Sequence, residues 1–350
     1  MSKPGYRLAL FATLLAAVVV LLGAYTRLTH AGLGCPDWPG CYGFLSVPMS
    51  EHKQTLAAER FPDAPLEVDK GWNEMVHRYF AGTLGLVILW LAGQALLRRG
   101  SGQPLRLPLG LLGLVVLQAA FGMWTVTLKL WPQVVTAHLL GGFATLSLLF
   151  LLALRLSGRL APLPAVPNGL RALAALGLLV VIGQVALGGW VSSNYAAVAC
   201  TDLPTCHGEW WPEMDFASGF NLAQHVGPNY LGGQLFSEAR TAIHVSHRLG
   251  ALLVCGVLLL LAWQLYRQRL NRLATLLLAA LALQIALGLS NVLLHLPLAV
   301  AVAHNGGGAL LVLLLVLINY RLRRPAASAE QSESESVPAG WTLSGQPGGQ

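Results

Sequence analysis

Four histidines of this chain fall inside apolar stretches, where a histidine is unusual. They are His77, His138, His247 and His304, each about five to seven residues inside the outer end of a predicted helix. Ionisable side chains in membrane helices usually mark a functional site. Two histidines on facing helices of a four-helix bundle can bind a haem iron from both sides. The pattern therefore predicts two haem sites, His77 with His138 and His247 with His304.

Two other interpretations of these histidines are weaker. A lone intramembrane histidine is about as often an interhelical hydrogen-bonding residue, but four in repeated positions disfavour that explanation. Zinc would need more ligands than two histidines supply, and the cysteines lie elsewhere in the chain. The glycine runs Gly141–Gly142 and Gly306–Gly308 follow two of the histidines. They would let a flat macrocycle or a neighbouring helix approach closely.

Glu74 is a carboxylate beside a candidate ligand, three positions before His77. At this spacing the two side chains share a helix face, so Glu74 could accept a proton or stabilise positive charge during a reaction. It could instead be an interfacial acid, stabilised by the helix dipole and by Arg78. Di-iron bundles also use Glu-x-x-His, but they require further carboxylates that are missing here. The second half of the chain has His244 at the equivalent position, so the two sites differ chemically.

Three arginines flank the candidate sites, namely Arg27, Arg78 and Arg248. They are either solvated residues at helix ends or partners for ligand carboxylates such as haem propionates. The sequence favours neither interpretation over the other.

The elements that must position these residues are membrane-spanning helices. Hydrophobic residues make up 55% of the 350 residues and charged residues 11%, against roughly a quarter charged in a soluble domain. A helix of about 20 apolar residues crosses the hydrocarbon core of a bilayer. Such stretches lie at 8–29, 72–97, 107–127, 133–154, 169–192, 242–266, 273–294 and 297–320. The sequence predicts an all-α integral membrane protein with eight transmembrane helices.

Charge predicts how these helices are oriented. Fourteen of the 22 Lys and Arg lie near the N-terminus, in the connections 98–106, 155–171 and 267–272, or at 321–324. The positive-inside rule puts these segments and both termini in the cytoplasm. Twelve of the 15 Asp and Glu lie in or beside the connections 30–71 and 193–241, which then face outward. No transit peptide precedes the first helix, so a bacterial inner membrane is expected. The net charge of +7 reflects this orientation, and no nucleic acid partner is expected.

An internal repeat divides the chain in two. "LGAYTRLTHAGLGC" matches "LGGWVSSNYAAVAC" at an offset of 165, and "LQAAFGMWTV" matches "LQIALGLSNV" at 166. We predict two tandem four-helix bundles related by a pseudo-twofold axis along the membrane normal. The expected units are residues 1–154, a cytoplasmic linker 155–171, residues 172–324 and a disordered tail 325–350.

Each unit carries one copy of the motif C-x-D-x-P-x-C, at Cys35 to Cys41 and at Cys200 to Cys206. Both copies face the oxidising side, so each pair is predicted to form a disulfide. Such short loops gain little chain entropy from the bond. The disulfides would therefore hold a loop over each site or exchange with a periplasmic redox protein. Cys255 lies in an apolar stretch and is predicted to be inert.

Four segments resemble the haem A synthase family, and the resemblance covers about residues 10–320. They are "TRLTHAGLGCPDWPGCYG", "NEMVHRYFAGTLG", "GGWVSSNYAAVACTDLPTCHGEWWP" and "IHVSHRLGALL". The resemblance implies an oxidoreductase that converts the C8 methyl group of haem O to the formyl group of haem A, by two hydroxylations and loss of water. Haem A then serves terminal oxidases of the cytochrome c oxidase class.

The resemblance also implies roles for individual residues. The catalytic glutamate of the family falls on Glu74, its haem O ligands on His77 and His138, and its ligands for a permanent haem b on His247 and His304. The implied partners are a haem O synthase, terminal oxidase assembly factors and membrane lipid, and a homo-oligomer is compatible with the sequence.

Two alternatives to this enzyme fit parts of the pattern. A di-haem cytochrome b that carries electrons between a quinone and a periplasmic partner would bind two haems of equal status. A transporter would explain the internal repeat, but the chain has no pair of helices broken by Gly or Pro at the middle of the membrane.

Overall fold

The computed structural model describes residues 3–99, 104–158, 160, 163 and 165–323. Eight helices in these ranges are long and apolar enough to cross a membrane. They are α1 (Tyr6–Leu28), α3 (Val68–Leu97), α4 (Arg106–Thr127), α5 (Pro132–Ser157), α6 (Asn168–Ser193), α8 (Ser237–Arg267), α9 (Asn271–Leu293) and α10 (Leu298–Leu322). The predicted class, an all-α membrane protein with eight transmembrane helices, is confirmed. The predicted disordered tail lies outside the described residues.

Helix ends follow local sequence signals. Pro132 occupies the first turn of α5, where a missing N–H costs nothing, and Gly158 ends the helix in the left-handed conformation. The helices α3 and α8 begin several residues before the predicted apolar spans, because their first turns are polar. Sequence analysis missed two short helices in the long connections, α2 (Glu51–Arg60) and α7 (Phe216–Gly219). Neither has an apolar stretch long enough to be detected as a span.

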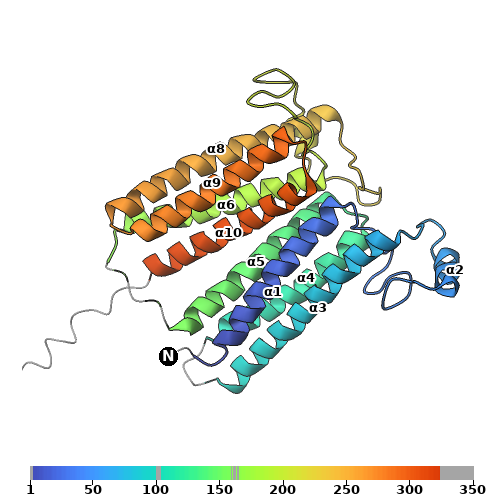
Figure 1. Ribbon diagram of the computed structural model, residues 1–350, viewed down its shortest axis with the longest axis horizontal. Coiled ribbons are helices and arrows are strands. Elements are labelled where there is room, and N and C mark those ends of the chain that lie inside the picture. Colours follow the sequence, from blue (N-terminus) through green and yellow to red (C-terminus); the bar gives the residue numbers. More distant parts are fainter. Residues whose placement is uncertain (1–2, 100–103, 159, 161–162, 164, 324–350) are drawn as a thin grey trace, which may run out of the picture.

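The eight long helices form two groups of four (Figure 1). One group contains α1, α3, α4 and α5, and the other contains α6, α8, α9 and α10. The connections 29–67 and 194–236 both emerge at one end of the molecule, which we call the long-loop end. The groups meet through α1 and α5 of the first and α6 and α10 of the second.

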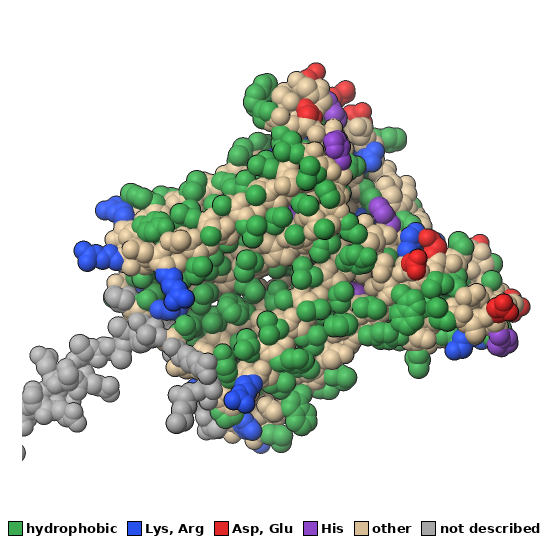
Figure 2. Space-filling view, in the orientation of Figure 1, with side chains coloured by type: hydrophobic (Ala, Val, Ile, Leu, Met, Phe, Trp, Pro, Cys, Tyr) green, Lys and Arg blue, Asp and Glu red, His purple; other side chains and the backbone are tan. Residues whose placement is uncertain are grey.

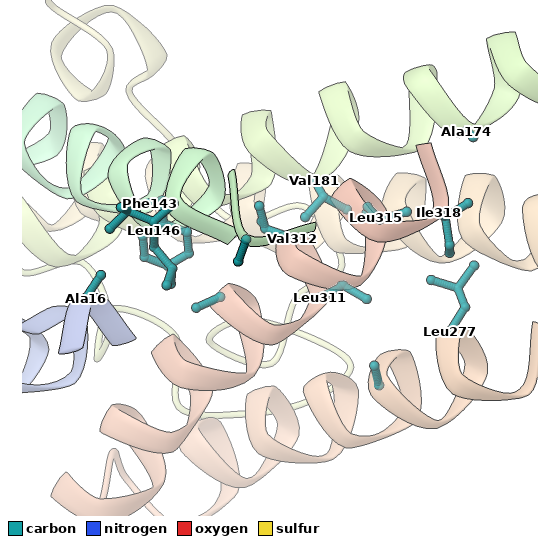
Figure 3. Packing of buried hydrophobic residues seen from close by; sticks show 14 of the residues in the cluster. Ala16, Phe143, Leu146, Ala174, Val181, Leu277, Leu311, Val312, Leu315 and Ile318 are labelled. Atoms are coloured by element: carbon teal, nitrogen blue, oxygen red, sulfur yellow. The ribbon is translucent and has the colours of Figure 1, made fainter. Parts of the chain in front are cut away.

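One hydrophobic core runs through both groups of helices. It joins Ala16 of α1 and Phe143 of α5 to Val181 of α6 and to Leu311 and Leu315 of α10 (Figure 3). Large apolar side chains also cover the sides of the helices (Figure 2), including Leu86 and Leu252, which are 69% and 68% exposed. Apolar side chains on the outside of a helix bundle are suited to lipid. The chain is a multi-pass membrane protein.

Charged side chains separate along the helix direction. Asp and Glu gather on the loops of the long-loop end, whereas Lys and Arg gather at the opposite end (Figure 2). The charge separation predicted from the sequence is therefore present in three dimensions.

Residues at equivalent repeat positions touch one another where the groups meet. At the long-loop end, Arg27 Nη2 donates to the Ser192 carbonyl at 2.5 Å, and the His30 ring stacks on the Tyr195 ring with centroids 5.5 Å apart. At the opposite end, the Tyr320 hydroxyl donates to the carbonyl of Leu154 at 3.3 Å. The members of each pair are 165 or 166 positions apart, as in the sequence repeat. In a twofold arrangement, a residue meets its own counterpart only at the axis.

Candidate functional site

The candidate ligands of the first unit face glycines on neighbouring helices. His77 of α3 lies against Gly23 of α1, where an added Cβ would be 3.0 Å from the imidazole Cε1. His138 of α5 lies against Gly122 of α4 in the same way, at 3.6 Å. A side chain at either glycine would crowd the facing ring, so the absence of a side chain makes room for the imidazole.

The second unit repeats this arrangement at the equivalent positions. His247 of α8 lies against Gly188 of α6, and His304 of α10 lies against Gly288 of α9, each with a separation of 3.2 Å between Cε1 and an added Cβ. The two helices that carry each predicted pair, α3 with α5 and α8 with α10, belong to one four-helix group. Each predicted pair therefore occupies one group at equivalent positions, and its role in binding a haem stays a prediction.

The histidines differ in their distance from the start of the helix. His138 and His304 each lie six residues after the first residue of their helix. His77 lies nine residues after Val68, and His247 ten after Ser237. The difference arises because α3 and α8 begin before their apolar spans with a polar first turn.

The buried ring nitrogens do not fit a simple interhelical contact. Nδ1 of His77, His138 and His304 is buried and has no hydrogen-bonding partner among the described residues. An interhelical structural histidine would be expected to satisfy its buried nitrogen. No group of three or more His, Cys, Asp or Glu in the described part of the chain could hold a metal ion. Pairs of histidines at glycine-lined positions suit an iron that already carries four ligands from a porphyrin.

Glu74 is buried at 5% exposure and has partners on both carboxylate oxygens. Its Oε2 accepts the Cys35 N–H at 2.9 Å, and its Oε1 pairs with Arg78 Nη2 at 2.5 Å. The ion pair was expected if Glu74 were an interfacial acid, but the burial was not. At the equivalent position, His244 is also buried, and its Nδ1 lies 2.9 Å from the carbonyl of Ala196. The two units therefore place different chemical groups at the same point of one scaffold.

Two of the flanking arginines donate hydrogen bonds to backbone carbonyls of the cysteine loops. Arg78 Nη1 donates to the carbonyls of Asp37 at 3.0 Å and Gly40. Arg248 donates to the carbonyls of Thr205 at 2.8 Å and Asp202 at 2.9 Å. Neither predicted role, a solvated helix end or a partner for haem propionates, anticipated these contacts. Each arginine fastens the cysteine loop of its unit to the helix that carries a candidate haem ligand.

The aspartate of the C-x-D-x-P-x-C motif organises each of these loops. Asp37 accepts the backbone N–H groups of Tyr42 and Gly43, at 2.6 and 2.8 Å. Asp202 accepts those of His207 and Gly208, at 2.9 and 3.0 Å. The hydroxyl of Thr205 and the Gly208 N–H hold the pKa of Asp202 well below its usual range. Sequence analysis missed this role, although the aspartate at the same place in both motifs was a usable signal.

The cysteines of each motif are joined in the structure. The sulfur atoms are 2.01 Å apart between Cys35 and Cys41 and 1.99 Å apart between Cys200 and Cys206. Cys255 of α8 is free and half-buried. The backbone next to the first disulfide reaches the candidate catalytic residue directly, through the hydrogen bond of the Cys35 N–H.

The glycine runs lie against side chains of neighbouring helices. A Cβ at Gly306 would be 2.9 Å from Cδ2 of Leu21, and one at Gly141 would overlap the amide of Gln118. These contacts match the predicted close approach of a helix. Sequence analysis did not single out the glutamines that lie at these glycines, although Gln118 and Gln284 are both the second residue of the repeated "LQ" segments.

Comparisons with known proteins agree with this architecture. A family model described as cytochrome oxidase assembly protein, COX15-CtaA, matches residues 6–316. A protein of Shewanella oneidensis named heme A synthase is 49% identical over 295 residues, which cover 83% of this chain and 88% of the relative. Proteins of the same name from Sphingopyxis alaskensis and Mesorhizobium japonicum are each 30% identical, over 80% of this chain and 81% and 80% of the relatives. The chain belongs to the COX15-CtaA family of cytochrome oxidase assembly proteins.

Proposed function

We propose that this chain is a haem A synthase in which the N-terminal unit binds the haem O substrate and the C-terminal unit binds a resident b-type haem. The activity rests on family membership and on the 49% identical relative that carries this name. It makes the protein an oxidoreductase that converts haem O to haem A. The assignment of the two units rests on their own residues.

The observation that carries this assignment is the difference between Glu74 and His244. Both are buried, and both lie one helical turn before a candidate haem ligand. Only the first unit has a carboxylate there, and a carboxylate can accept a proton or stabilise positive charge at a carbon that is being oxidised. The unit with Glu74 is therefore the reaction site, and the unit with His244 holds the haem that stays.

The chain's own residues position the substrate and control its surroundings. His77 and His138 hold the substrate haem between α3 and α5, next to the Glu74 carboxylate. Arg78 orients that carboxylate and also fastens the loop closed by Cys35 and Cys41 at the long-loop end. Such a loop limits the access of water, which strengthens electrostatic effects at the site. A bound haem would supply the redox chemistry, which amino-acid side chains lack.

The proposal also includes the orientation of the protein in the membrane and the symmetry of its two units. The long-loop end faces outward, and both termini lie in the cytoplasm of a bacterial cell, as the charge separation supports. The two units are related by a pseudo-twofold axis along the membrane normal. The contacts of Arg27 with Ser192 and of Leu154 with Tyr320, at opposite ends of the helices, support this axis. Haem O reaches the first unit from a haem O synthase, and the product passes to terminal oxidase assembly.

Pigment analysis tests the proposed activity. The chain is expressed together with a haem O synthase in cells that lack their own haem A synthase, and the extracted haems are identified by mass. We expect haem A in these cells and only haem O and protohaem in cells with an empty vector. A di-haem electron carrier would leave haem O unconverted, and that result would reject the proposed activity.

A further inference from the structure

A glutamine lies against the candidate ligand His247 in a way that depends on a neighbouring glycine. Gln184 of α6 faces α8, where Gly250 follows His247 by three positions and so lies on the same face of the helix. A Cβ at Gly250 would overlap the Gln184 amide. Because position 250 is a glycine, the glutamine side chain can reach the histidine between the two helices.

Gln184 contacts both the backbone and the ring of this histidine. Its Nε2 donates to the backbone carbonyl of His247 at 2.9 Å and lies 3.1 Å from the ring Nδ1. Its Oε1 is buried and has no hydrogen-bonding partner among the described residues. An unpaired buried amide oxygen is costly, so this atom is expected to have a partner in the loaded protein.

A haem-bound histidine supplies such a partner. An imidazole that binds iron through Nε2 carries its remaining proton on Nδ1. Metal-bound histidines almost always donate this proton to an oxygen, which fixes the ring and makes the imidazole a stronger ligand. At His247 the amide of Gln184 is the side-chain group within reach of Nδ1.

The first unit lacks this glutamine. Its repeat counterpart is Val19 of α1, whose apolar side chain can neither donate nor accept a hydrogen bond. The counterpart of Gly250 is Phe80, so the glycine that admits the amide is also missing there. A strong additional hold on the ligand suits a haem that stays, whereas a substrate must be released after reaction.

We propose that Gln184 is a positioning residue for the resident haem: when His247 carries its proton on Nδ1, the Gln184 amide turns so that its unpaired oxygen, in place of the nitrogen that lies 3.1 Å from Nδ1 here, accepts that proton. This inference rests on the proposed assignment of His247 as a ligand of that haem. Accepting the proton gives the ring more negative character, which stabilises ferric over ferrous iron and lowers the midpoint potential. Loss of the Gln184 amide should therefore raise the midpoint potential of the resident haem and speed its dissociation.

The test compares purified, haem-loaded protein with Gln184→Leu, Gln184→Glu and Gln118→Leu variants. For Gln184→Leu we expect a higher midpoint potential and roughly 10- to 100-fold faster haem loss to apomyoglobin, the usual scale for a lost partner of a metal ligand. Gln184→Glu keeps an oxygen acceptor and should not raise the potential. Gln118→Leu removes an amide from the first unit and should leave the potential of the resident haem unchanged.

The possible outcomes separate this inference from the proposed function. A Gln184→Leu protein with unchanged potential and unchanged haem loss overturns the role of Gln184, provided that His247→Ala protein lacks the haem. A His247→Ala protein that keeps the haem overturns the ligand assignment itself, and the inference with it. If Gln184→Leu protein binds no haem, Gln184→Glu decides: recovered binding supports the role, and absent binding shows that Gln184 is needed only for folding.

Discussion

At the scale of single residues, the proposed function assigns the four histidines to two haems with different roles. Their rings occupy equivalent positions against equivalent glycines, so geometry alone does not distinguish substrate ligands from ligands of a resident haem. The difference comes from neighbouring residues, namely Glu74 in the first unit and Gln184 in the second. Substituting histidines in one unit should therefore affect one haem and spare the other.

The first prediction concerns His247. His247→Ala removes a ligand of the resident haem, so the low-spin b-type absorption of the purified protein should be lost. His77→Ala is the matched control, because it makes the same change at the equivalent position of the first unit. Its spectrum should keep the b-type signal. An unchanged spectrum in His247→Ala protein would show that the resident haem is bound elsewhere.

At the scale of elements, each unit fastens its cysteine loop to the helix that bears a histidine. The aspartate of the motif binds backbone N–H groups inside the loop, and Arg78 or Arg248 binds the loop carbonyls from the helix. Each short loop is therefore held both from within and from the helix. In each loop, the disulfide therefore acts together with the hydrogen bonds of the aspartate and the arginine.

The state of these cysteines can be measured directly. Because Cys35, Cys41, Cys200 and Cys206 are paired, none of them should react with an alkylating reagent in denatured, unreduced protein. Only the free Cys255 should be labelled, and reduction should expose all five thiols to mass mapping. Labelling of the four loop cysteines before reduction would contradict the pairing.

The long helices could be predicted from the sequence, because hydrocarbon demands a continuous apolar stretch and leaves few alternatives. The pairing of the histidines followed from the repeat. The backbone partners of Arg78, Arg248 and Glu74 could not be predicted, because they belong to loops whose course depends on tertiary contacts. The ion pair of Glu74 with Arg78, by contrast, was anticipated from the sequence. The polar first turns of α3 and α8 were missed for a related reason: outside the hydrocarbon, hydropathy no longer marks a helix.

At the scale of the whole molecule, the two units share one core and meet at pairs of equivalent residues. Such an arrangement lets one scaffold evolve two sites of different chemistry while each keeps the same helix packing. In the proposed function both sites lie toward the long-loop end, whose connections carry most of the acidic groups. The side of the membrane that this end faces therefore determines from which side redox partners and substrate can reach the sites.

The orientation is tested with exposed positions at opposite ends. Trp210→Cys places a thiol on the loop between α6 and α8, and Gln268→Cys places one in the turn between α8 and α9. A membrane-impermeant maleimide should label Trp210→Cys protein in cells whose outer membrane alone is permeabilised. Gln268→Cys protein should be labelled only after the inner membrane is opened. The reverse pattern would mean that the predicted topology is inverted.

We assign the reaction to the first unit because this unit carries Glu74. Glu74→Gln keeps the shape of the side chain and removes its charge, and the loss of an acid–base group typically slows a reaction by roughly 100- to 10,000-fold. An acid that only stabilises the helix would leave activity intact, and Glu74 lies six residues after Val68, beyond the first turn where the helix dipole acts.

The decisive measurement is therefore the mass analysis of haems from cells in which Glu74→Gln protein is the only copy, together with the absorption spectrum of the purified variant. We predict accumulated haem O, little or no haem A and an intact b-type spectrum, which shows that the variant is folded and loaded. A near-normal yield of haem A would contradict the catalytic role of Glu74 and, with it, the assignment of the first unit as the reaction site.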